Sequence, residues 1–180
     1  MMKKIIALTL SLMMILCAAS ALAGETAEKT RLGSLTVNET FTIQSKIPEN
    51  YKFTPILANS GLNMVGTLEG GEGDPAVYIS IAYNEEYNGV ERFNDLDEAT
   101  VAKIKESFME MDDVVFEDLE TAYGTKLLKV TQADKSFADI YTVYKGYELE
   151  FVIAAQDEVK EADIQMLVDF ISDMDFVPAE

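Results

Sequence analysis

The sequence contains no histidine and no tryptophan, and only one of its 180 residues is a cysteine. Without histidine the chain has no Ser-His-Asp triad, and it lacks the side chain that most often ligates zinc, copper and haem. A single cysteine also excludes an intramolecular disulfide. Several common catalytic classes are therefore excluded before any motif is considered.

Basic residues are scarce as well, because 14 Lys and Arg stand against 32 Asp and Glu and give a formal net charge of −18. A surface of this charge repels nucleic acid and anionic membranes, so we expect neither as a partner. The charge has two alternative interpretations. One is that the acidic surface only keeps the protein soluble, and the other is that it attracts cations or a basic protein partner.

The N-terminus has the pattern of a secretory signal peptide. Lys3 and Lys4 precede an apolar run over residues 5–16, and Ala21-Leu22-Ala23 follows, which predicts cleavage after Ala23. The apolar run is shorter than the roughly 20 residues that cross a bilayer, and no second long run follows, so we expect no transmembrane segment. The predicted location is secreted or periplasmic.

Removal of residues 1–23 would take away Cys17, which is preceded by Leu16 rather than by the small residue typical of a lipid-anchor site. The predicted mature chain has 157 residues and no cysteine, so thiol nucleophiles are excluded too. Loss of two lysines and no acidic residue changes its net charge to −20. This length suits one domain with its own core.

The mature chain opens with a segment of low apolar content, residues 24–34, which predicts a flexible leader before a single α+β domain over residues 35–180. Short runs with alternating apolar and polar residues predict strands over 41–48, 51–53, 62–68, 77–83, 114–119, 126–130, 137–144 and 147–154. The first four runs suggest two antiparallel pairs. Tight turns at Tyr123-Gly124 and Lys145-Gly146 join the later runs as hairpins.

Two segments have helical periodicity instead. After a cap at Asn94 or Asp95, apolar residues recur at Val101, Ile104 and Phe108, and a second amphipathic helix is predicted over residues 158–174. Tight turns rather than helical crossovers join the strands, so we expect a mainly antiparallel sheet with helices laid on its faces.

This order of elements includes three short patterns: Phe41-x-Ile43-x-x-x-Ile47-Pro48, Gly146-Tyr147 turning into Leu149-x-Phe151-x-Ile153, and Ile171-Ser172 before Phe176. Together they resemble the PsbP-like superfamily over residues 39–177. That superfamily includes the extrinsic PsbP protein of photosystem II, a Ran-binding import factor and bacterial domains of unknown function. The resemblance implies an αβα sandwich that binds other proteins and usually catalyses nothing. Members often carry Trp where this chain has Tyr51, and no functional residue carries over.

The best carboxylate pair for catalysis is Glu148 and Glu150, which alternate with apolar residues and so lie on one strand face, about 7 Å apart. That distance suits an inverting glycosidase, but every i, i+2 pair on a strand has it. The favoured interpretation is a solvated strand face.

The loop at residues 70–74 is rich in glycine but has no lysine, so it does not match a phosphate-binding loop. A hairpin turn is the favoured interpretation. Glu69, Glu72 and Asp74 are weak candidates for a calcium site there, although no segment has the spacing of an EF-hand loop.

Three hypotheses of function follow. The leading one is a secreted, non-catalytic domain that binds another extracytoplasmic protein, for which we expect an exposed apolar or aromatic patch of several hundred Å² and no cofactor. The first alternative is an acidic domain that responds to calcium. The second is a carboxylate-dependent hydrolase, which needs a pocket with two carboxylates, one of them with a raised pKa.

Overall fold

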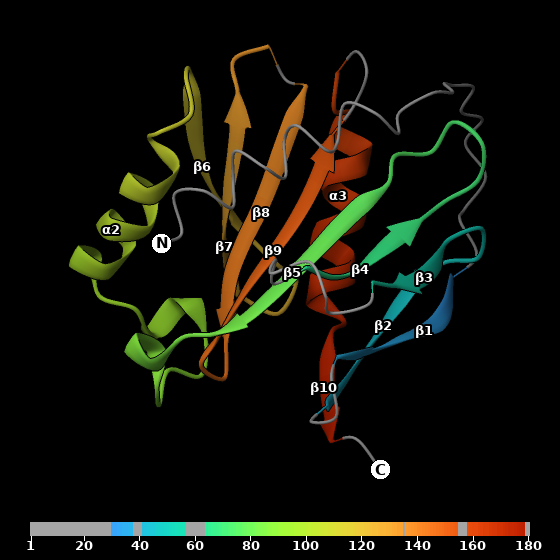
Figure 1. Cartoon of the computed structure of the whole chain (residues 1–180), viewed down its shortest axis with the longest axis horizontal. Helices are drawn as coiled ribbons and strands as arrows, with labels where there is room; N and C mark the ends of the chain where they lie inside the picture. Colours follow the sequence, from blue (N-terminus) through green and yellow to red (C-terminus); the bar gives the residue numbers. More distant parts are fainter. Residues whose placement is uncertain (1–29, 38–40, 57–63, 135, 155–157, 179–180) are drawn as a thin grey trace.

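The computed structural model describes residues 30–37, 41–56, 64–134, 136–154 and 158–178, so the predicted signal peptide lies outside the described residues. The described residues form a seven-stranded sheet, a three-stranded sheet and two α-helices (Figure 1). The structure thus confirms the predicted α+β fold class with mainly antiparallel strands.

The seven-stranded sheet has the order β3-β4-β5-β9-β8-β7-β6, and all neighbours run antiparallel. Its strands are β3 (Lys52–Pro55), β4 (Met64–Glu69), β5 (Val77–Tyr83), β6 (Val114–Glu120), β7 (Lys126–Gln132), β8 (Phe137–Tyr144) and β9 (Tyr147–Ala154). The predicted hairpins at Gly124 and Gly146 are confirmed, and both glycines have a positive φ that favours glycine.

The three-stranded sheet consists of β1 (Thr30–Val37), β2 (Phe41–Pro48) and β10 (Asp175–Pro178), with β2 in the centre. Two predictions are corrected here. Strand β2 pairs with β1 and β10 rather than with β3. Strand β1 begins at Thr30, inside the segment predicted as a flexible leader, because pairing with β2 satisfies its backbone.

Helix α2 (Glu98–Phe108) follows two short 3₁₀ turns, η1 (Glu85–Tyr87) and η2 (Phe93–Asp95). Its N-cap is Asp97, whose side chain accepts the Thr100 N–H at 2.7 Å, and not Asn94 or Asp95 as predicted. Ile104 and Phe108 pack with Tyr141 and Val143 of β8. Helix α2 therefore covers one face of the sheet.

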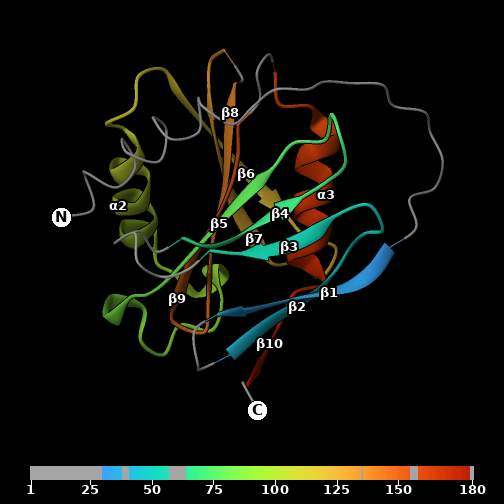
Figure 2. The same cartoon turned by 45° about the vertical axis from the view of Figure 1, so that its right-hand side comes forward.

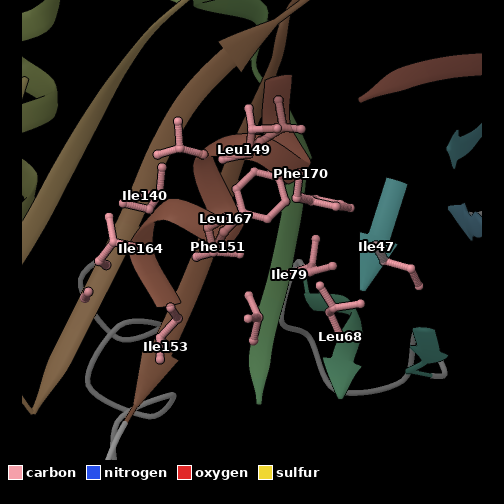
Figure 3. Close-up of a cluster of buried hydrophobic side chains, with 14 of the residues drawn as sticks. Ile47, Leu68, Ile79, Ile140, Leu149, Phe151, Ile153, Ile164, Leu167 and Phe170 are labelled. Atoms are coloured by element: carbon pink, nitrogen blue, oxygen red, sulfur yellow. The ribbon is translucent and has the colours of Figure 1, made fainter. Parts of the chain in front are cut away.

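Helix α3 (Glu161–Ser172) covers the opposite face, where Leu167 and Phe170 pack with Ile140 of β8 (Figure 2). The helix ends earlier than predicted because residues 175–178 form β10. Figure 3 shows buried apolar side chains from both sheets gathered around α3. The expectation that helices lie on both faces of the sheet is confirmed.

No helix within the described ranges is long and apolar enough to cross a membrane.

Candidate functional site

Four aromatic side chains gather where β5, β8 and β9 meet β10, and we call this cluster the aromatic end: Tyr83, Tyr144, Tyr147 and Phe176. Strand register places Tyr147 opposite both Tyr83 and Tyr144. The Phe176 ring stacks on Tyr144 with centroids 4.8 Å apart, and the Tyr83 ring meets Tyr147 edge-on at 5.4 Å. Residues from both sheets therefore form one continuous aromatic group.

The β8–β9 turn fixes this arrangement. Lys145 and Gly146 have φ values of 50° and 81°, as expected for a two-residue turn whose twist matches the strands. The turn is anchored by the Lys145 N–H, which donates to the Glu91 carbonyl at 3.0 Å. A Cβ on Gly146 would lie 3.2 Å from the Tyr83 ring, so glycine also leaves room for that ring.

The aromatic end is partly open to solvent. The Tyr83 side chain is 54% exposed, and the other three rings are half-buried. The Lys145 ammonium lies 5.0 Å from the centroid of the Tyr144 ring. Large aromatic rings that are rigidly held and only partly covered are typical of the residues that dominate protein–protein binding. Of the four rings, Tyr83 is the exposed one, and the other three extend the aromatic surface in part.

A second cluster lies on the face under α2, and we call it the carboxyl cluster: Asp139, Glu148 and Glu150. Across the β8–β9 pair, Asp139 is opposite Val152 and Tyr141 is opposite Glu150, so Asp139 and Glu150 are diagonal neighbours. Asp139 is 2% exposed, and its Oδ1 atom has no hydrogen-bond partner.

The prediction that Glu148 and Glu150 lie on a solvated strand face is wrong. Both are partly buried, because α2 and the 3₁₀ turns cover this side of the sheet. Glu148 accepts a hydrogen bond from the Asn84 amide at 2.8 Å. Burial, with a further contribution from the Glu148 charge, raises the pKa of Glu150 to about 7.

Asp139 is the functional candidate that sequence reasoning missed. Burial raises its pKa well above the usual range, and the nearby Glu150 charge acts in the same direction. The signal was present in the sequence, since β8 is buried at seven consecutive positions and Asp139 is the only charged residue among them. A lone acid within an otherwise apolar central strand favours a buried carboxyl.

The tyrosines beside this cluster are also buried. The Tyr141 and Tyr87 hydroxyls lie 3.4 Å apart, and burial raises the pKa of both phenols. Both rings are therefore neutral over the range in which the carboxyls titrate. The carboxyl cluster thus lies beside two buried phenols, and its most buried member, Asp139, is almost inaccessible to solvent.

The three calcium candidates have separate local partners. Asp74 accepts the Gly71 N–H at 2.8 Å and the Asn50 amide at 2.7 Å, which makes it part of the turn. Glu69 accepts the Thr67 hydroxyl at 2.7 Å, while Glu72 is exposed. Across the described part of the chain, no three acidic, histidine or cysteine side chains are grouped so as to hold a metal ion.

Neither the protein-family models nor the curated proteins give a match to this chain. Among solved structures, the chain is similar to the solution structure of cyanobacterial PsbP (CyanoP) from Synechocystis, with 12% sequence identity and a TM-score of 0.51. The alignment covers 88% of this chain and 98% of that one. Together with the antiparallel sheet and its two helices, this likeness shows that the chain has the PsbP-like fold.

Proposed function

We propose that the protein is a secreted, non-catalytic domain that binds another extracytoplasmic protein through the aromatic end. The observation that carries this proposal is the set of four contacting rings at one end of the sheet, with Tyr83 54% exposed. Rings held in place by neighbours lose little entropy when a partner covers them, so they bind efficiently.

A protein partner suits this surface better than the other classes. The negative charge of the chain disfavours nucleic acid and anionic lipid. The non-catalytic part of the proposal is supported by the composition, since the chain has no histidine and its one cysteine lies in the predicted signal peptide. Location outside the cytoplasm rests on the predicted signal peptide.

Site-specific photo-crosslinking in the producing cell tests the binding surface. A photoreactive phenylalanine analogue at position 83 reports on the aromatic end, and one at position 109 is the matched control, since Met109 is also apolar and is 68% exposed. We expect one protein species to crosslink from position 83 and not from position 109. The same products from both positions, or none from position 83, would contradict the proposal.

Cell fractionation tests the location separately. We expect the shortened chain, cut after Ala23, in the periplasm or the medium. Full-length chain retained in the cytoplasm would contradict secretion while leaving the crosslinking result to judge the binding surface.

A further inference from the structure

Asp139 is a carboxyl group in the interior with fewer hydrogen bonds than an ionised carboxylate needs: a hydrogen bond with the Phe151 backbone favours the ionised form, but one carboxyl oxygen has no partner. It lies in the central strand β8, where positions 137–143 are all buried, and its Oδ1 atom makes no hydrogen bond. An ionised carboxylate in such a place pays a large desolvation penalty, whereas a protonated carboxyl pays much less.

Among the residues that the structure describes, the groups that face Asp139 include no cation to offset a negative charge. Four elements contribute titratable groups to this face of the sheet, all acids or phenols: Glu148 and Glu150 from β9, Tyr141 from β8 itself, Tyr78 from β5, and Tyr87 from η1. Of these, Glu150 is the diagonal neighbour of Asp139. The facing residues of β7 are the apolar Leu128 and Val130.

Helix α2 contributes no cation to the cluster either. The partly buried lysine of the helix, Lys105, lies over the Phe116 ring and pairs with Asp118 of β6 at 3.6 Å. The other charged residues of α2 are exposed. A proton is therefore the positive charge that this cluster can take without rearrangement.

We propose that Asp139 and Glu150 share a proton at neutral pH and act as a pH switch, which holds the sheet closed under α2 while the proton is bound and loosens it when the proton is lost. The proposal stands whether or not the aromatic end binds a partner. Its physical basis is that two diagonal carboxyls in a poorly solvated place cannot both ionise without cost.

The direction of the pH effect follows from linkage. The pKa values of Asp139 and Glu150 are raised in the folded chain, so the folded state binds more protons than the unfolded state above about pH 4. Stability is therefore highest in mildly acidic solution and falls as the pH rises through about 7. Most proteins lose stability in the acidic direction instead.

Composition makes this effect easy to detect. The chain has no histidine, the residue whose ordinary pKa lies near neutrality, and its one cysteine is in the predicted signal peptide. Few other groups change charge between pH 5.5 and 8.0, so a change of stability in that range points to the carboxyl cluster.

Thermal unfolding of the purified protein between pH 5.5 and 8.0 tests the switch. We expect the Tm of the wild type to fall by about 5 °C across this range. Asp139→Asn, which mimics the protonated group, should flatten the slope and raise the Tm at pH 8.0. The matched control is Asp118→Asn, because Asp118 is an exposed strand acid already paired with Lys105. It should keep the wild-type slope.

Two results would overturn the proposal: a flat wild-type profile, or a slope that Asp139→Asn leaves unchanged. Glu150→Gln covers the case in which Asp139→Asn fails to fold. It removes the other half of the pair at a partly exposed position, and it should also flatten the slope. A Glu150→Gln slope equal to that of the wild type would count against the shared proton in the same way.

Discussion

Adjacent residues of strand β9 lie in opposite environments. On the face toward α3, Leu149, Phe151 and Ile153 are completely buried among apolar side chains. On the face toward α2, Glu148 and Glu150 alternate with them, and Glu150 is a diagonal neighbour of the buried Asp139 of β8. One face is built for packing alone, while the other holds ionisable groups whose charge depends on pH. Strands β8 and β9 therefore carry both the apolar side chains that stabilise the fold and the carboxyl groups that can change protonation.

The largest effect should come from the apolar face. Phe151→Ala removes a fully buried ring that meets Phe170 of α3 at 5.6 Å, so we expect the free energy of unfolding to fall by about 3–5 kcal/mol. Urea denaturation measures it. Val115→Ala, at a position that is 52% exposed, is the control and should cost about 0.5 kcal/mol or less. Equal losses in the two variants would contradict the role of this face.

The next effect concerns the Lys145-Gly146 turn, which sets the register between β8 and β9. Gly146→Ala places a Cβ at φ 81° and 3.2 Å from the Tyr83 ring, so it should lower the free energy of unfolding by about 1–2 kcal/mol. Gly89→Ala separates the two causes, since Gly89 has φ 84° but open space around it. If Gly89→Ala costs as much as Gly146→Ala, the Tyr83 contact contributes nothing.

A smaller effect is expected from the hydroxyl groups on the α2 face. Tyr141→Phe removes a long hydrogen bond of 3.4 Å to the Tyr87 hydroxyl and keeps the ring, so the free energy of unfolding should fall by about 0.5–1 kcal/mol. Tyr123→Phe, at a ring that is 70% exposed, should change nothing measurable. A loss several times larger for Tyr141→Phe would indicate that the hydroxyl belongs to a stronger network.

The smallest effect is expected from calcium. Asp74 already accepts hydrogen bonds from Gly71 and Asn50, and Glu69 accepts one from Thr67, so the loop offers no converging carboxylates. Calcium should raise the Tm no more than sodium chloride of matched ionic strength, which screens the same net charge. A calcium-specific rise would revive the hypothesis of a calcium-responsive acidic domain.

Local features of the fold could be predicted from the sequence. The strands from β6 to β9 follow directly from alternation of apolar residues. The short loop at residues 121–125 and the two-residue turn Lys145-Gly146 make β6–β7 and β8–β9 local hairpins, so their pairing is set locally. Pairing of β2 with β10 could not be predicted, since Ile43 meets Phe176 across more than a hundred residues. The strand Thr30–Val37 was missed because its polar sequence becomes a strand through pairing rather than propensity.

The candidate sites were predicted less completely than the fold. Alternation correctly placed Glu148 and Glu150 on one face, but their burial depends on α2, which packs there from a different part of the chain. The aromatic end combines residues of both sheets, so no sequence pattern could assemble it. Asp139 could have been found from its place in an apolar central strand.

The most direct test of the difference between the two faces is an NMR titration of the side-chain carboxyl ¹³C resonances of the folded protein. We predict that the Asp139 carboxyl titrates well above the usual pKa range of aspartate, because it is buried next to Glu150, and that the Glu150 resonance shifts near pH 7. If Asp139 and Glu150 both titrate near pH 4 with the exposed acids, the α2 face is an ordinary solvated surface and the account is wrong.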